Sequence, residues 1–238
     1  MKKLSLRSLI PNLFTFISLT LGLTALKFAI ENKWQISVSL VIFASFLDNI
    51  DGKIARLLKS NSNFGVELDS LSDLISFGVT PAIIVYLWSE SMSIQGMWAM
   101  VIFYAICSTS RLARFNISSH ENQSNSKKIK FFSGISTPAA AGLTLLPLMF
   151  NFRFNIDFFI NTYFIKFYLI IPSILMISNL PTYSLKGIKF EKKLLPFVII
   201  LLASFLSLLL TDFWLAMIIL ITTYYLTIPL AIYDFKKI

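Results

Sequence analysis

Residues 48–73 read DNIDGKIARLLKSNSNFGVELDSLSD, directly after the apolar run SVSLVIFASFL at residues 37–47. The chain has 12 acidic residues, and four aspartates fall within this one short stretch. Charged side chains at the end of an apolar segment are costly, and they mark functional sites more often than plain surface. The four aspartates are Asp48, Asp51, Asp69 and Asp73.

The spacing of these aspartates predicts two helix faces. Residues three and four apart lie on the same side of a helix, which pairs Asp48 with Asp51 and Asp69 with Asp73. The segment between the two pairs, about 57–64, is short, and a short connection favours antiparallel packing of neighbouring helices. We therefore expect the four carboxylates to converge on one pocket.

The composition predicts a membrane protein. Of the 238 residues, 56% are apolar and only 14% are charged, against about 25% charged in soluble domains; the mean hydropathy is +0.74. The apolar residues form runs of about 20, the length of a membrane-spanning helix. We expect an all-α, polytopic transmembrane helical bundle forming a single domain over 1–238. Its eight predicted spans are roughly 9–30, 34–58, 69–88, 95–115, 134–150, 162–180, 194–210 and 212–233.

The net charge of +9 fits a membrane protein better than a nucleic-acid-binding one, because 17 of the 21 basic residues fall in alternate connections and at the termini. The positive-inside bias predicts that both termini are cytoplasmic. A polar loop at about 116–133 is either a mobile cover over a cytoplasmic site or a plain linker. Its His120, the sole histidine, and the lone Cys107 receive no role.

Four converging carboxylates repel one another unless cations lie between them. Oxygen ligands favour magnesium, manganese or calcium over zinc, and two such ions suit a diphosphate substrate. Gly52 and Ala55 share the face of Asp48 and Asp51 and leave room for a ligand. Arg56 offers a planar donor fork for phosphate.

The combined pattern resembles the signature of the CDP-alcohol phosphatidyltransferase family. It reads Asp48-x2-Asp51-Gly52-x2-Ala55-Arg56-x8-Gly65-x3-Asp69-x3-Asp73. The resemblance implies a helical membrane enzyme, often a homodimer, with its site facing the cytoplasm. It implies that Asp48, Asp51 and Asp69 bind two divalent metal ions, either Mg2+ or Mn2+. Asp73 would complete the metal site and act as the base, and the CDP pocket would be lined by Gly52, Ala55, Arg56 and Gly65.

Further segments are similar to the phosphatidylserine synthase branch of that family. They are IPNLFTFISLTLGLTA at residues 10–25, RLARFN from Arg111 to Asn116, FFSGISTPAAAG at 131–142, and SNLP at 178–181. Members of this branch often have proline where this chain has Ser136. The similarity implies transfer of a phosphatidyl group from CDP-diacylglycerol to L-serine, with release of CMP.

Serine has a carboxylate that a bidentate arginine can hold. We therefore expect an acceptor site at Arg111, Arg114 and Asn116, in which at least one arginine binds that carboxylate. The alternative for each arginine is that it only anchors the end of a span.

Two other functions stay open. The same enzyme could use glycerol 3-phosphate or inositol phosphate as acceptor, since only the acceptor pocket would change. From another class, a divalent-cation transporter also places acidic residues inside a bundle, although these aspartates crowd one end of it. The many Lys, Ile, Asn and Phe residues indicate an AT-rich bacterial genome. We therefore expect an inner-membrane location, an anionic lipid bilayer as partner and no nucleic acid.

Overall fold

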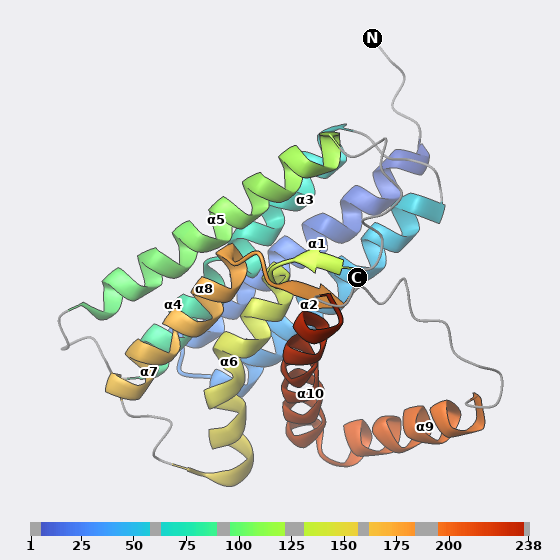
Figure 1. Cartoon of the computed structure of the whole chain (residues 1–238). Coiled ribbons are helices and arrows are strands. Elements are labelled where there is room, and N and C mark those ends of the chain that lie inside the picture. Colours follow the sequence, from blue (N-terminus) through green and yellow to red (C-terminus); the bar gives the residue numbers. More distant parts are fainter. Residues whose placement is uncertain are drawn as a thin grey trace.

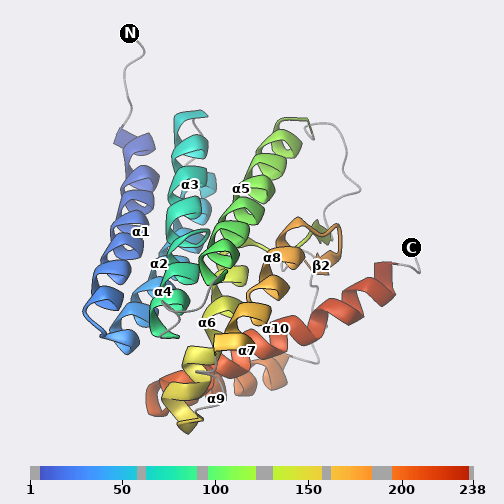
Figure 2. The same cartoon turned by 90° about the vertical axis from the view of Figure 1, so that its left-hand side faces the viewer.

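The structure is a computed structural model that describes residues 6–57, 63–89, 96–121, 131–156, 162–183 and 195–235. Helices account for nearly all of this, and they form a bundle from which one helix, α9, stands apart (Figures 1 and 2). The helices are α1 (Leu6–Ile30), α2 (Trp34–Leu57), α3 (Asn63–Ser76), α4 (Thr80–Trp88), α5 (Met97–Glu121), α6 (Thr137–Phe154), α7 (Thr162–Tyr168), α8 (Ile170–Ile177), α9 (Leu195–Thr211) and α10 (Phe213–Phe235).

Helix α1 packs through a stripe of small residues. Thr15, Ser18, Gly22, Ala25 and Ala29 alternate at spacings of three and four, and all five are buried. Small side chains let membrane helices approach closely. This stripe brings α1 against α2 and against the continuous stretch formed by α3 and α4.

Buried hydroxyl groups tie α1 to its neighbours. Ser72, Ser76 and Thr80 recur every four residues, and each donates a hydrogen bond to a backbone carbonyl of α1, at 3.2, 3.3 and 3.5 Å. Such hydrogen bonds between helices contribute about 0.6 kcal/mol each in a membrane. They fix α3, which carries Asp69 and Asp73, relative to α1.

Two predicted spans are each divided into two helices. The span expected at 69–88 belongs to α3 and α4, which are separated by the turn at residues 77–79, and the span expected at 162–180 divides at Leu169 into α7 and α8. Pro81 and Pro172 lie in the first turns of α4 and α8. Since proline has no N–H to donate to the preceding turn, a helix readily restarts there.

The all-α expectation needs one addition, a two-stranded antiparallel sheet of β1 (Phe131–Ser133) and β2 (Pro181–Tyr183). Its register pairs Phe131 with Tyr183 and Ser133 with Pro181. The polar loop expected at 116–133 is also shorter, since α5 continues to Glu121 and β1 begins at Phe131; residues 122–130 lie outside the described part. The sheet joins the segment before α6 to the end of α8.

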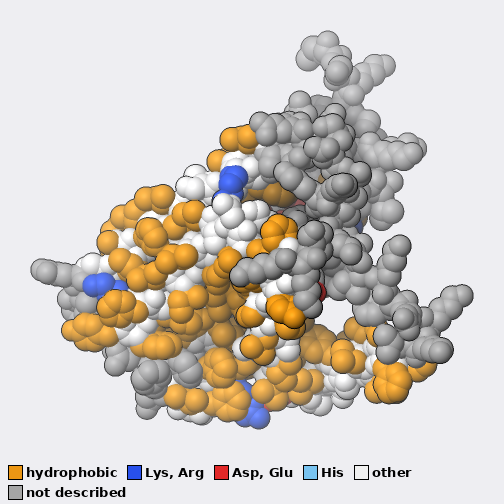
Figure 3. Space-filling model, viewed as in Figure 1, with side chains coloured by type: hydrophobic (Ala, Val, Ile, Leu, Met, Phe, Trp, Pro, Cys, Tyr) orange, Lys and Arg blue, Asp and Glu red, His pale blue; other side chains and the backbone are white. Residues whose placement is uncertain are grey.

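The outer surface is largely apolar, as a membrane requires. Hydrophobic side chains cover most of the described surface in Figure 3, and α9 buries none of its residues. Within the described residues, three stretches are long and apolar enough to cross a membrane: Pro11–Ile30, Phe64–Trp88 and Phe213–Phe235. The protein is therefore a helical membrane protein, whereas eight spans and cytoplasmic termini remain predictions.

All four tryptophans lie at helix ends on one side of the bundle. Trp34 begins α2, Trp88 ends α4, and Trp98 and Trp214 are second in α5 and α10. Trp34, Trp88 and Phe152 line one pocket, the Phe152 ring contacts Trp214, and Tyr86, near the end of α4, contacts Trp98. Tryptophan prefers the membrane–water interface. Asp48 lies 14 residues after Trp34 on α2, which is about 21 Å along a helix. With hydrocarbon about 30 Å thick, we expect the aspartates in the opposite half of the membrane, towards its far boundary.

Candidate active site

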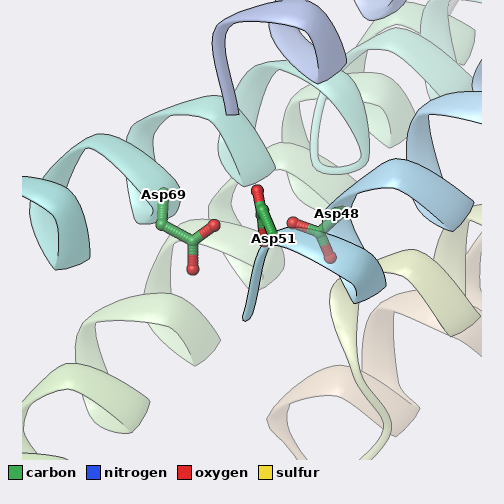
Figure 4. Close-up of side chains that lie close together, drawn as sticks. All are labelled: Asp48, Asp51 and Asp69. Carbon is green, nitrogen blue, oxygen red and sulfur yellow. The ribbon is translucent and has the colours of Figure 1, made fainter. Parts of the chain in front are cut away.

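The two helices bring the predicted aspartates together. Asp48 and Asp51 project from α2 and Asp69 projects from α3 into the space between these helices (Figure 4). One carboxylate oxygen from each of the three lies within 4.8 Å of the others. Three separate carboxylates therefore converge at one point.

Asp73, one turn further along α3, lies beside this group. Its carboxyl group lies close enough to that of Asp48 for the two groups to interact electrostatically. Oδ2 of Asp73 accepts a hydrogen bond of 3.3 Å from Thr137. Oδ1 is buried without a hydrogen-bond partner among the described residues. One oxygen of Asp73 is thus anchored, while the other is left for a ligand or a proton.

Helix α1 also contributes to the site. Asp51 is the most buried of the three clustered carboxylates, with 4% of its surface exposed. Thr15 donates a hydrogen bond of 3.1 Å to its Oδ2. This contact fixes one oxygen of the Asp51 carboxylate.

The positions predicted for CDP binding lie on the same two helices. Ala55 and Arg56 belong to the last turn of α2, where their side chains fall outside the described part, and Gly65 belongs to the first turn of α3. A Cβ atom added to Gly52 would meet no described atom within 4 Å. Packing within the described chain therefore does not require glycine at position 52, in contrast to Gly22, where a Cβ would collide with Ser76.

The two arginines predicted for the acceptor have different surroundings. Nη1 of Arg111 donates a hydrogen bond of 3.1 Å to Thr137, and its Nε is buried without a partner among the described residues. Arg114 faces the end of α8, where it donates to the carbonyls of Met176, Ile177 and Ser178 and to Oδ1 of Asn179. Of the two arginines, only Arg111 is linked to an aspartate by described hydrogen bonds, through Thr137 to Asp73.

Asn116 and Ser136 also have structural partners. Oδ1 of Asn116 accepts a hydrogen bond of 3.1 Å from Ser70 of α3, so it links α5 to the helix of Asp69. Ser136 is the N-cap of α6, and its hydroxyl accepts from the backbone N–H of Ala139 at 3.3 Å. Its φ of −71° is also close to the value that proline imposes. The departure at position 136 therefore keeps the backbone conformation that a proline would have.

Thr15 and Thr137 also belong to the site, although the aspartate pattern does not contain them. Both hydroxyl groups contact a predicted aspartate. Thr15 lies within the apolar run of α1, and Thr137 lies in the FFSGISTPAAAG segment. The small-residue spacing of α1 was the available signal for Thr15, since it marks the buried face of that helix.

The donor set fits a hard divalent cation. The cluster offers carboxylate oxygens alone, which suit Mg2+ or Mn2+. No ion pair joins any of the four aspartates to a basic residue within the described ranges. Carboxylates so close together need positive charge to remain ionised, and a bound cation at Asp48, Asp51 and Asp69 would supply it.

Comparison with known proteins defines the class of this chain. The chain belongs to the CDP-alcohol phosphatidyltransferase family, whose family model matches residues 8–183. The match extends from α1 to the end of β2 and contains all four aspartates.

Curated relatives with the same printed name come from distant bacteria. Proteins named CDP-diacylglycerol–serine O-phosphatidyltransferase occur in Mycobacterium bovis and Helicobacter pylori. The Mycobacterium bovis protein is 35% identical to this chain, over 73% of this chain and 60% of the relative. The Helicobacter pylori protein is 35% identical, over 82% of this chain and 80% of the relative. The protein of that name in Mycobacterium leprae is 30% identical over 95% of this chain and 75% of the relative. The chain thus spans about 60% of the length of the first of these relatives.

Proposed function

We propose that this protein transfers the phosphatidyl group of CDP-diacylglycerol to the hydroxyl group of L-serine, giving phosphatidylserine and CMP. The family match and the names of the relatives support this reaction. The observation that carries the proposal is the convergence of Asp48, Asp51 and Asp69 within 4.8 Å, with Asp73 beside them. A cluster of this kind suits a doubly charged diphosphate held through metal ions.

The reaction is a single displacement at phosphorus. The serine oxygen forms a bond to the phosphorus that carries diacylglycerol, and the bond from that phosphorus to the CMP oxygen breaks, so CMP leaves with the electron pair. Asp73 takes the hydroxyl proton, and its unpartnered Oδ1 supports this role. A positioned base of this kind contributes about 100- to 10,000-fold. Metal bound at Asp48, Asp51 and Asp69, completed by Asp73, supplies neutralisation of the diphosphate and of the charge developing on CMP.

The CDP group would bind along the ends of α2 and α3. The open space beside Gly52 supports close approach of the nucleotide to the backbone. Ala55, Gly65 and the guanidinium group of Arg56 complete this proposed pocket, with Arg56 as the phosphate ligand. The acceptor carboxylate would lie on the other side of Asp73, at Arg111, whose buried and unpartnered Nε supports the assignment.

The location and assembly of the protein are part of the proposal. Asp48 and Asp51 lie towards the end of α2 that is opposite Trp34, and the basic residues Lys53 and Arg56 follow them on the same helix. Positive charge favours the cytoplasmic side. We place the protein as a homodimer in a bacterial inner membrane with the site facing the cytoplasm. Each chain would form a single domain of eight spans, with both termini cytoplasmic.

The test is an acceptor panel. Purified protein in detergent receives CDP-diacylglycerol and manganese or magnesium, with serine, glycerol 3-phosphate or inositol phosphate, and the phospholipid product is identified by mass. Phosphatidylserine as the product with serine, and none with the others, supports the proposal. A lipid product formed with another acceptor, and not with serine, would support the phosphatidyl transfer but reject serine as the acceptor. Manganese uptake into proteoliposomes without any lipid product would instead indicate a transporter.

A further inference from the structure

The first residue of α6 joins the two halves of the proposed site through one hydroxyl group. Thr137 is completely buried. Its Oγ1 accepts a hydrogen bond of 3.1 Å from Nη1 of Arg111 and donates one of 3.3 Å to Oδ2 of Asp73. A hydroxyl group has one donor and two acceptor positions, so both contacts form together.

This bridge keeps two oppositely charged groups apart. No ion pair within 4.0 Å joins Arg111 to Asp73 in the described part of the chain. Each keeps a buried polar atom without a partner among the described residues, Nε of Arg111 and Oδ1 of Asp73. A carboxylate and a guanidinium group otherwise pair directly through two parallel hydrogen bonds. Direct pairing would consume the atoms that the acceptor needs.

The start of α6 is held in place from several directions. Ser136 caps the helix through Ala139 N–H, and Pro138 lies in the first turn. Tyr225 of α10 donates a hydrogen bond of 2.8 Å to the carbonyl oxygen of Ala139. These contacts fix the backbone on either side of Thr137, and with it the point from which its hydroxyl reaches Arg111 and Asp73.

We propose that Thr137 is a positioning residue that holds the Asp73 carboxylate and the Arg111 guanidinium group one hydroxyl apart, so that one can take the acceptor proton while the other binds the acceptor anion. The inference rests on the proposed function. It adds a specific requirement, a hydroxyl group at position 137, that the aspartate pattern does not contain.

The test compares three substitutions in the full-length protein. Thr137→Val removes the hydroxyl and nearly keeps the shape, Thr137→Ser keeps the hydroxyl, and Thr144→Val alters a buried threonine two turns further along α6 that has no described bond to Asp73 or Arg111. We measure kcat and the KM of serine and of CDP-diacylglycerol, the melting temperature, and Mn2+ binding by electron paramagnetic resonance.

We expect Thr137→Val to lower kcat by about 10- to 100-fold, which is part of the roughly 100- to 10,000-fold that a positioned base contributes. The KM of serine rises, whereas the KM of CDP-diacylglycerol and Mn2+ binding stay near those of the unaltered protein. The variant stays folded with a somewhat lower melting temperature, because Arg111 and Asp73 each lose a buried hydrogen-bond partner. Thr137→Ser recovers most of the activity, and Thr144→Val behaves as the unaltered protein. Arg111→Ala should lower the activity of the Thr137→Val protein by a much smaller factor than it lowers the activity of the unaltered protein, because the two residues act through one contact.

Three results would overturn the inference. The first is that Thr137→Val keeps full activity. The second is that Thr137→Ser is as impaired as Thr137→Val although both stay folded, which would make the side-chain volume, not the hydroxyl, important. The third is that both KM values rise equally. An unaltered protein that releases no CMP with any acceptor overturns the proposed function, and this inference with it.

Discussion

The hydroxyl group of Thr15, on α1, donates a hydrogen bond of 3.1 Å to Oδ2 of Asp51, on α2. Thirty-six residues separate them in sequence, and both are buried. The same threonine accepts a hydrogen bond on its carbonyl from Ser72 of α3. One residue of α1 thus contacts both helices that carry the aspartates, and it orients a carboxylate that we assign to metal binding.

Thr15→Val should therefore weaken metal binding. Loss of a group that orients a ligand carboxylate usually costs about 10- to 100-fold in metal affinity or activity. The measurement is the Mn2+ dependence of CMP release, with Mn2+ binding followed directly. Thr20→Val is the matched control, because the Thr20 hydroxyl is exposed and bonds only to the carbonyl of Phe16 in its own helix. Equal effects of the two substitutions would reject the role of Thr15.

Gly52→Ala should leave the fold intact and impair nucleotide binding. The added methyl group meets no described atom within 4 Å, and alanine in a helix is about 1 kcal/mol more favourable than glycine. We expect an unchanged or higher melting temperature with a raised KM for CDP-diacylglycerol. Gly22→Ala is the contrasting case, since its methyl group collides with Ser76 and should lower the melting temperature. Unaltered kinetics of the Gly52→Ala protein would show that Gly52 does not line the nucleotide pocket.

Arg111 and Arg114 should give different phenotypes. Arg114 holds the end of α8 through hydrogen bonds to three backbone carbonyls and Asn179, and a hydrogen bond from a charged donor contributes about 1.5–3 kcal/mol. Arg114→Ala should therefore lower the melting temperature. Arg111→Ala should raise the KM of serine far more than that of CDP-diacylglycerol. An Arg114→Ala protein that is as stable as the unaltered protein but binds serine poorly would contradict these separate roles of the two arginines.

Ser136→Pro should be close to neutral for stability. The substitution loses the cap contact to Ala139, worth about 1 kcal/mol, but the φ of −71° suits proline, and a rigid residue in a compatible conformation regains about 0.4–1 kcal/mol. Ser136→Ala loses the cap without that compensation, so it should melt at the lower temperature of the two. Thermal unfolding in detergent measures both, and a Ser136→Pro protein less stable than Ser136→Ala would contradict the assigned backbone role.

The position of each long helix could be predicted because membrane length and apolar composition are properties of the sequence itself. The predicted 9–30 and 34–58 correspond to α1 and α2 within a few residues. The break after Ser76 was harder to predict, because Gly78 and Pro81 lie in a stretch whose residues are mostly apolar on both sides of the break. Three-residue strands such as β1 and β2 are too short to leave an alternating pattern.

The aspartates of the site could be predicted because their spacing places them on two faces of adjoining helices. The spacing of α1 marked only the buried face on which Thr15 lies, and no pattern marked Thr137. Each acts through a partner distant in sequence, and threonine is ordinary in an apolar helix. For the same reason the sequence could not separate Arg111 from Arg114. They are three residues apart on α5, and only the positions of α6 and α8 show which one contacts the site and which one holds a helix end.

We propose above all that the carboxylates of α2 and α3 hold the divalent metal that release of CMP from CDP-diacylglycerol requires. The most direct test is CMP release by metal-free protein, with CDP-diacylglycerol and serine, as Mn2+ is added to the unaltered protein and to the Asp69→Asn and Asp73→Asn variants. We predict that release by the unaltered protein requires the metal. Asp69→Asn should need much more Mn2+, and Asp73→Asn should stay folded and release almost none. Release that is independent of metal, or full activity in folded Asp73→Asn protein, would contradict the account.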